Sequence, residues 1–137
     1  GQVMVERVNR EVVESYGIAD LGNVVLEPFK SVALKGLVEK PSPEHAPSNL
    51  AVLGRYVLPS KVLELLEDTG AGVGGEIQLT DALDELLKLE GLNALETDAE
   101  IHDCGNKQGF LGANLAVGMR DAETKLAIKK LFKSNGW

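Results

Sequence analysis

The chain has 137 residues and a formal net charge of −7, with 44% hydrophobic and only 4% aromatic residues. A domain of this length can bury roughly two-thirds of the surface that its unfolded chain exposes, so we expect a core of Val, Leu, Ile and Ala. The acidic balance, without clustered Lys and Arg, argues against nucleic-acid binding. No apolar run approaches the length of about 18 residues that predicts a membrane span, so no membrane partner is expected.

The first half of the chain has the pattern of a sheet. Residues 3–8, 16–26 and 31–38 are β-leaning segments, separated by turn-forming residues and followed by a loop with three prolines. Residues 49–58 form a nearly continuous apolar run, which is typical of a strand covered on both faces. The chain begins directly before the first predicted strand, which is unusual for a natural domain. We therefore expect it to be part of a larger domain.

The second half has mainly helical patterns. A helix is expected after Ser60 and should end near Thr69, followed by a glycine-rich connector over 70–75 and a second helix with Thr80 as its N-cap. Residues 92–96 and 100–103 are weaker strand predictions. Residues 107–132 are helix-like and are expected to divide into two helices near 120–123.

Strands that alternate with helices predict an α/β layered fold with a mixed or mainly parallel sheet. The single cysteine, Cys104, allows no internal disulfide and agrees with a cytoplasmic location. No Ser, Cys or Lys is placed beside a base in the way that covalent catalysis requires.

Glu39 and Lys40 stand at the end of a predicted strand, where open α/β sheets bind their ligands. Pro41 is expected to hold Lys40 in an extended conformation. Adjacent side chains of a strand point to opposite faces, so both can reach one ligand only if the strand twists or bulges here. The alternative is a solvent-exposed acid-base pair at a turn, which is the more common arrangement.

Asp103 lies in a predicted strand-to-helix turn that contains Gly105 and leads to Lys107. A carboxylate in such a turn can bind Mg²⁺, which takes one or two carboxylates and completes its coordination with water and phosphate oxygens. A helix-capping aspartate has the same sequence pattern, so that alternative stays open.

Four segments, in this order and at these spacings, resemble one enzyme family. They are VEKP at 38–41, APSNLA at 46–51 followed by GRYV at 54–57, GEIQLTDA at 75–82, and HDCGNK at 102–107. Together they are similar to the second half of bacterial UTP-glucose-1-phosphate uridylyltransferases, over about residues 3–117. The resemblance implies the C-terminal part of a Rossmann-like nucleotide-diphospho-sugar transferase fold.

The resemblance also implies an activity, transfer of a uridylyl group from UTP to glucose 1-phosphate with Mg²⁺ as cofactor. Gly17 and Glu39 would then hold the glucose hydroxyls, Lys40 would pair with the sugar phosphate, and Asn49 would lie near the sugar. Asp103 would supply one of two carboxylates for Mg²⁺, and Lys107 would contact phosphate. Lys40 and Asp103 are the expected catalytic residues.

The family's glycine-rich G-x-G-x-R segment and its first metal-binding aspartate have no counterpart here. We therefore expect residues 1–137 to be a single fragment, the sugar-binding half of the domain, inactive alone. Loss of neighbouring strands would expose an edge, so we also expect a homo-oligomer. The alternatives are another sugar-1-phosphate nucleotidyltransferase, or a non-catalytic module for sugar-phosphate binding or assembly.

Overall fold

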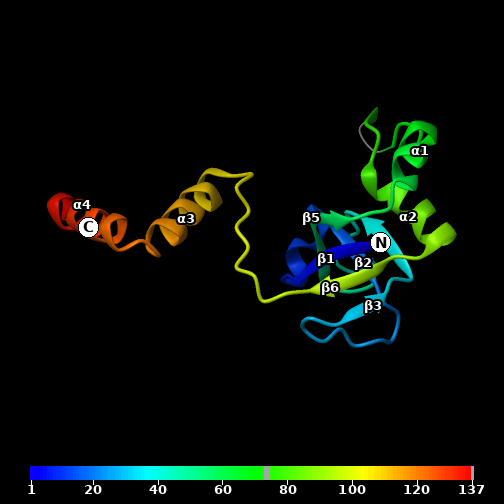
Figure 1. The fold of residues 1–137 in the computed structure, drawn as a ribbon, viewed down its shortest axis with the longest axis horizontal. Helices are drawn as coiled ribbons and strands as arrows, with labels where there is room; N and C mark the ends of the chain where they lie inside the picture. Colours follow the sequence, from blue (N-terminus) through cyan, green and yellow to red (C-terminus); the bar gives the residue numbers. More distant parts are fainter. Residues whose placement is uncertain (73–74, 137) are drawn as a thin grey trace. The chain divides into compact units, whose positions relative to one another are not determined.

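The computed structural model describes residues 1–72 and 75–136, which form two compact units, Gly1–Asp98 and the part of the chain from Ala99 onward. The first unit contains every described strand, and the second contains two helices (Figure 1). The expected glycine-rich connector over 70–75 includes residues 73–74, which lie outside the described residues. No helix among the described residues is long and apolar enough to cross a membrane.

The first unit is built on a six-stranded sheet with the strand order β3-β6-β1-β5-β2-β4. Between the first two strands in the chain lies a short 3-10 helix, η1, at Arg10–Ser15. The strands are β1 (Gln2–Arg7), β2 (Gly17–Asp20), β3 (Ser31–Ala33), β4 (Gly36–Glu39), β5 (Leu50–Val57) and β6 (Asn93–Glu96).

The fold is α/β and the sheet is mixed, as expected, but the expectation of mainly parallel pairing is wrong for this chain. Within the described residues, β1 and β6 are parallel, whereas the pairs β1–β5, β2–β5, β2–β4 and β3–β6 are antiparallel. Parallel neighbours need a long connection, and β1 and β6 are the first and last described strands in the chain, so the elements between them, including both helices, form that connection. Among the described residues, the other connections between consecutive strands contain one helix, the short 3-10 helix η1 between β1 and β2.

The single strand expected over 31–38 is divided into β3 and β4. These two strands lie at opposite ends of the strand order. The N–H of Leu34 bonds to Leu92 O at 2.8 Å, and that of Lys35 bonds to Asp20 O at 2.8 Å. The chain therefore leaves one set of hydrogen-bond partners and joins another within two residues, which no apolar pattern indicates.

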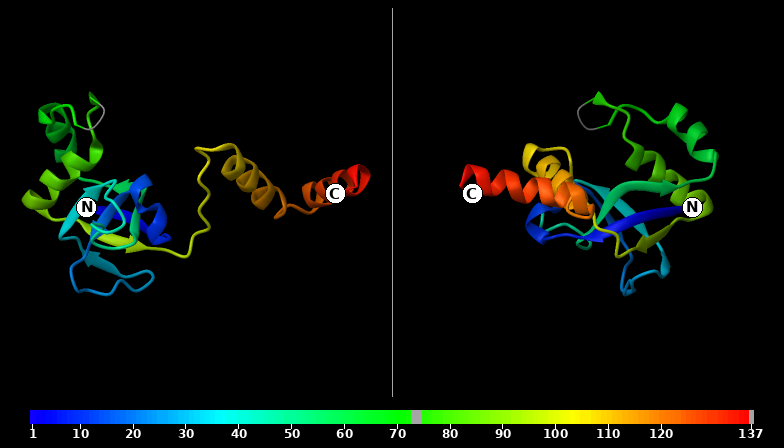
Figure 2. Two further views of the ribbon diagram at one scale, coloured as in Figure 1. Left: turned by 180° about the vertical axis from the view of Figure 1, so that it is seen from behind. Right: turned by 60° about the vertical axis from the view of Figure 1, so that its left-hand side comes forward.

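Two helices pack on the sheet, α1 (Lys61–Asp68) and α2 (Leu79–Glu90), and they lie together on one side of it (Figures 1 and 2). The core between the helices and the sheet contains Val3 and Val5 from β1 and Leu83 and Leu86 from α2, all at most 1% exposed. Helix α2 begins at Leu79, so the N-cap is Gln78 and not Thr80. Thr80 is thus inside the first turn.

Strand β5 is covered on both faces only at its start. Leu50 and Ala51 are adjacent and point to opposite faces, and each is buried in a different core cluster. Toward its end the strand is open, and Val57 is 73% exposed. The expectation of a strand covered on both faces is therefore confirmed for the first residues of β5 and wrong for the last ones.

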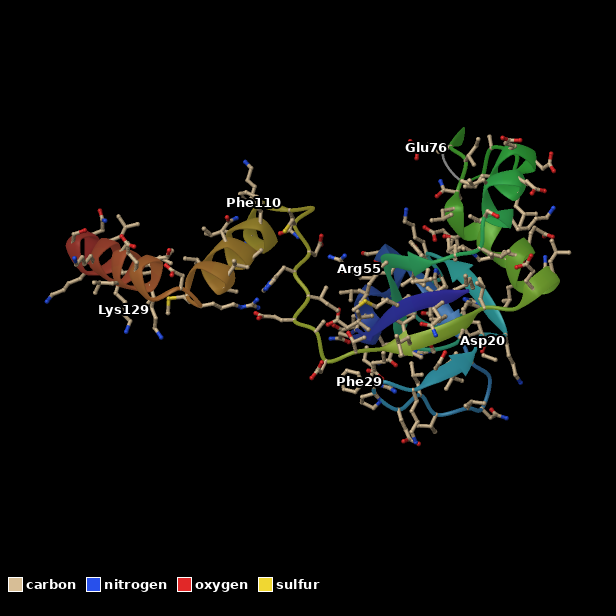
Figure 3. All side chains as sticks on the ribbon, viewed as in Figure 1. Asp20, Phe29, Arg55, Glu76, Phe110 and Lys129 are labelled. Atoms are coloured by element: carbon tan, nitrogen blue, oxygen red, sulfur yellow. The ribbon has the colours of Figure 1, made fainter. Side chains whose placement is uncertain are left out.

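The second unit consists of α3 (Lys107–Gly118) and α4 (Ala122–Asn135), which confirms the expected division of the C-terminal helical segment. Residues 100–103, expected as a strand, have no regular structure. No described residue of either helix is buried, and large apolar side chains such as Phe110 are exposed (Figure 3). Helices of this length are marginal without an apolar face packed against something else.

Candidate functional site

Glu39 is held at the junction between β4 and α2. It is the last residue of β4, where it pairs with Gly17 of β2. The Thr80 hydroxyl, from the first turn of α2, donates a hydrogen bond to Glu39 Oε2 at 2.8 Å. The Glu39 side chain is only 21% exposed. A carboxylate with this much burial needs polar partners, and Thr80 is one of them.

Lys40 turns toward the same carboxylate, but not by the backbone conformation that we expected. Its φ is 47°, so it is in the left-handed region and not extended. Its N–H still bonds to Tyr16 O at 3.0 Å, and the chain then bends away into the loop that begins at Pro41. The bend removes the strand alternation, and Lys40 Nζ lies 3.7 Å from Glu39 Oε1. Acid and ammonium can therefore serve one ligand.

Because Lys40 has a left-handed backbone conformation, a glycine at this position should make the protein more stable than an alanine, the reverse of the usual order in a helix. A residue with a Cβ pays about 1 kcal/mol in this region, which glycine does not pay. We expect Lys40→Gly to be more stable than Lys40→Ala by about 1 kcal/mol in urea unfolding. At Lys88, within α2, the same pair should show the opposite order, because glycine weakens a helix interior. Equal preferences at the two positions would contradict the assignment.

Gly17 lies against this pair without adding a side chain. A Cβ at Gly17 would be 3.1 Å from Glu39 Oε2 and 3.8 Å from Thr80 Oγ1. That separation from the carboxylate is tighter than ordinary van der Waals contact. Glycine therefore leaves room for the carboxylate beside β2, and the use of this backbone toward a ligand stays a prediction.

Tyr56 of β5 is under the electrostatic influence of Glu39, a connection that its sequence position did not indicate. Burial and then the negative charge of Glu39 raise the pKa of the Tyr56 phenol above its usual value. The phenol therefore lies within the electrostatic reach of the Glu39 carboxylate. Tyr56 does lie in the GRYV segment, but a tyrosine in a strand is ordinary and carries no signal of its own.

Asn49 has a backbone partner that the sequence did not indicate. Its Nδ2 donates to Val8 O at 3.0 Å, while the Val8 N–H donates to Asn49 O at 3.0 Å. The residue therefore joins the end of β1 to the start of β5. Its side-chain oxygen is left for other contacts, so a contact with sugar stays a prediction.

Asp103 and Lys107 belong to the second unit. Asp103 Oδ1 accepts from the Gly105 N–H at 2.8 Å, so it closes its own turn. The N-cap of α3 is Asn106, whose side chain accepts from the Gly109 N–H at 2.8 Å. Asp103 is therefore not the capping residue, and the capping alternative is excluded. Lys107 is the first residue of α3 and is exposed.

The described residues offer few side chains that could together hold a metal ion. Among residues 1–72 and 75–136, no group of three or more His, Cys, Asp or Glu is placed to hold a metal ion. Asp103 Oδ2 is near Asn106 Nδ2 at 3.4 Å, a long contact that a cation could replace. One carboxylate with open lone pairs fits Mg²⁺ when phosphate oxygens and water supply the other ligands.

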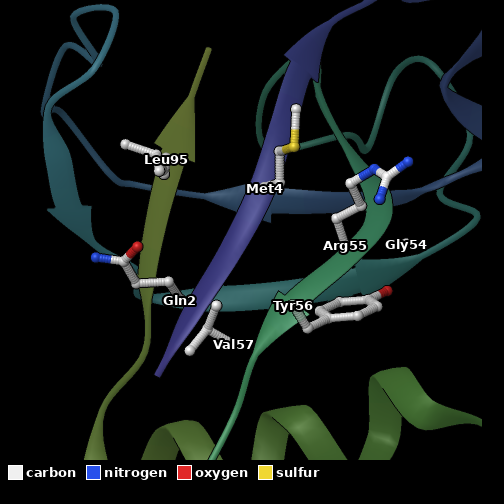
Figure 4. Close-up of a pocket in the computed structure, with 7 residues that line it drawn as sticks. All are labelled: Gln2, Met4, Gly54, Arg55, Tyr56, Val57 and Leu95. Carbon is white, nitrogen blue, oxygen red and sulfur yellow. The ribbon is translucent and has the colours of Figure 1, made fainter. Parts of the chain in front are cut away.

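A separate hollow lies on the open face of the sheet, with a volume of about 550 Å³ (Figure 4). It is formed by strands β1, β5 and β6, and includes none of the residues predicted to bind ligand. Its lining is Gln2, Met4, Gly54, Arg55, Tyr56, Val57 and Leu95.

Comparison with known proteins agrees with the expected resemblance. The nucleotidyl transferase family matches residues 1–119. The UTP-glucose-1-phosphate uridylyltransferase of Haemophilus influenzae is 45% identical over 133 residues, which cover 97% of this chain and 45% of that protein. The Escherichia coli K12 enzyme of the same name is 47% identical over 119 residues, covering 87% of this chain and 39% of its own length.

Two solved structures share the fold. A UTP-bound UGPase from Acinetobacter baumannii has a TM-score of 0.82 and 41% identity, and the match covers 96% of this chain and 44% of that one. A UDP-glucose pyrophosphorylase complexed with UDP-glucose has a TM-score of 0.78 and 38% identity, covering 88% and 44%. The chain thus spans less than half the length of these relatives. It belongs to the nucleotidyl transferase family, whose enzymes generally use a divalent metal.

Proposed function

We propose that this chain supplies the sugar-phosphate-binding part of a UTP-glucose-1-phosphate uridylyltransferase. The observation that carries the proposal is the cluster of Gly17, Glu39, Lys40 and Thr80, in which a half-buried carboxylate and an ammonium lie 3.7 Å apart. A sugar phosphate offers the complementary groups, hydroxyl donors and a phosphate anion. A cytoplasmic location, expected from the sequence and in agreement with its single thiol, belongs to the same proposal.

The reaction would join glucose 1-phosphate to UTP. A phosphate oxygen of the sugar forms a bond to the α-phosphorus of UTP, and the bond from that phosphorus to the oxygen bridging to the β-phosphate breaks. The products are UDP-glucose and pyrophosphate. The second pKa of a phosphate monoester is about 6, so the attacking oxygen is already anionic at neutral pH and needs no general base. The protein's tasks are alignment and charge neutralisation.

Glu39, Gly17 and Lys40 each have a task that follows from their chemistry. Glu39 accepts hydrogen bonds from sugar hydroxyls, and the open backbone of Gly17 lets the ring approach. Lys40 is 57% exposed, so its Nζ can leave Glu39 and pair with the sugar phosphate. Asn49 lies near the sugar and Lys107 contacts phosphate in this proposal.

Asp103 would hold the metal through one carboxylate, and the second carboxylate that the resemblance implies would come from the part of the family fold that this chain does not span. When bound, Mg²⁺ supplies positive charge against the phosphates of the nucleotide. Asp103 is already kept in a fixed turn by the Gly105 N–H. A Cβ at Gly109 would overlap the Asp103 carbonyl oxygen, so the first turn of α3 holds the aspartate closely.

The test is UDP-glucose formation by the purified chain with UTP, glucose 1-phosphate and Mg²⁺, with a full-length relative as positive control. We expect binding of glucose 1-phosphate without turnover. Clear turnover would contradict the assignment of nucleotide binding to the remainder of the family fold. Failure to bind glucose 1-phosphate at millimolar concentration would overturn the proposal itself, and preference for another hexose 1-phosphate would favour a different nucleotidyltransferase.

We also propose that the isolated chain self-associates. The open face of β1 and β5 carries Val57 at 73% exposure, and α3 and α4 expose Phe110 and Leu126 at 59% and 53%. Apolar surface of this extent favours association. Sedimentation at tens of micromolar should give a dimer or larger species, and a single monomeric species would contradict it.

A further inference from the structure

The hydrogen bond between Thr80 and Glu39 joins two segments that are 41 residues apart in the sequence. The Thr80 Oγ1 donates to Oε2 at 2.8 Å, which is a normal length for a hydroxyl bound to a carboxylate. Lys40 Nζ is at 3.7 Å from Oε1, beyond hydrogen-bond length, and its side chain is 57% exposed. Thr80 therefore restrains the carboxylate more closely than Lys40 does.

A glutamate needs such a restraint if it is to recognise two hydroxyls at once. Its terminal torsion is broad, so the plane of the carboxylate is not set by rotamer preference. Gly17, on the neighbouring strand, has no side chain that could pack against the carboxylate. A hydrogen-bond donor that is fixed in space can set the plane of the carboxylate, and the Thr80 hydroxyl is such a donor.

The position of Thr80 is itself fixed by the hydrophobic core. Later turns of α2 bury Ala82, Leu83 and Leu86, each at most 1% exposed. Helix α2 also packs beside β4, the strand that ends at Glu39. The Thr80 hydroxyl is thus attached to the most buried helix of the first unit and cannot follow the glutamate if it swings away.

We propose that Thr80 is a positioning residue for the sugar-recognising carboxylate of Glu39. The hydroxyl occupies one lone pair of Oε2 and leaves the second lone pair, together with Oε1, to accept hydrogen bonds from two neighbouring hydroxyls of a hexose 1-phosphate. This inference rests on the proposed function, because it assigns the orientation of the residue that the proposal places against the sugar.

The test compares Thr80→Val with Thr80→Ser in the full chain. Valine keeps the branched shape and removes the donor, whereas serine keeps the donor. The probes are glucose 1-phosphate and inorganic phosphate, titrated by NMR. We expect valine to weaken glucose 1-phosphate binding about 10-fold, serine to stay within about 3-fold, and phosphate binding to change less than about 2-fold in both.

The two probes distinguish positioning from a general structural role. A loss that is equal for glucose 1-phosphate and phosphate, or equal for valine and serine, would overturn the inference. A double-mutant cycle with Glu39→Ala, which removes both acceptor oxygens, is read by urea unfolding and tests the contact without ligand: additive effects would overturn the inference while leaving the proposed function standing. Absence of glucose 1-phosphate binding by the unaltered chain would overturn the proposed function, and the sugar-directed role of Thr80 with it.

Discussion

Glutamine in place of Glu39 should weaken glucose 1-phosphate binding by this chain about 30- to 100-fold. The amide has nearly the same shape, but it loses the negative charge and one of two acceptor oxygens. Hydrogen bonds to a charged group contribute about 1.5 to 3 kcal/mol, roughly twice those between neutral groups, and about 1.4 kcal/mol corresponds to a factor of 10. Titration calorimetry or NMR of the purified chain measures the change.

The control for this substitution is Glu64→Gln, which changes the net charge equally. Glu64 lies on α1 and is 69% exposed, in an ion pair with Lys61. Exposed pairs of this kind contribute little, so binding should stay within about 2-fold. A similar small effect of Glu39→Gln would remove Glu39 from the site.

Tyr56 gives a second readout of the same substitution, independent of ligand. The charge of Glu39 is one cause of its raised phenol pKa, after burial. Removing that charge favours the phenolate, so the pKa should fall toward its ordinary value without reaching it. Absorbance titration above pH 9, in a Tyr16→Phe background, reports the shift. An unchanged titration would show that the two groups do not share one region.

Alanine in place of Leu86 is expected to lower the free energy of unfolding of the first unit by about 2 to 5 kcal/mol. Leu86 is 0% exposed, on the face of α2 that packs against the sheet. Its truncation removes buried methyl groups and leaves a cavity that the close-packed strands can fill only in part. Urea unfolding, followed by circular dichroism, measures the loss.

Leu89 on the same helix is the matched control, since it is 61% exposed. The substitution Leu89→Ala has the same chemistry and a small gain in helix propensity, so it should change stability by less than about 0.5 kcal/mol. Losses of equal size at Leu86 and Leu89 would contradict the placement of α2 on the sheet.

Much of the secondary structure follows from local pattern. Strand β1 alternates buried and partly exposed residues with the period of two that a half-covered strand requires. The polar residues near Arg120 separate α3 from α4, where Asp121 caps the second helix by accepting from the Thr124 N–H at 2.7 Å. Strand period, capping residues and turn residues act over a few positions, so they can be read from a sequence.

The errors arose where partners far apart in the sequence decide the local structure. The stretch that becomes β3 and β4 has one continuous β-like pattern, but its two halves pair with β6 and β2. The expectation of mainly parallel pairing failed for the same reason, because β-propensity carries no information about the direction of a neighbour. The start of α2 at Leu79 moved Thr80 from the cap into the first turn.

What the sequence by itself determined is the family, through four ordered segments that include VEKP, together with the helices and most of the strands. Only the tertiary structure decided which residues lie around Glu39 of the VEKP segment. The β2–β4 pairing puts Gly17 opposite Glu39, packing of α2 brings Thr80 to Glu39 Oε2, and the left-handed backbone turns Lys40 toward Oε1. Each of these depends on hydrogen bonds and burial between segments about 20 to 40 residues apart, and such contacts exist only once the chain has folded.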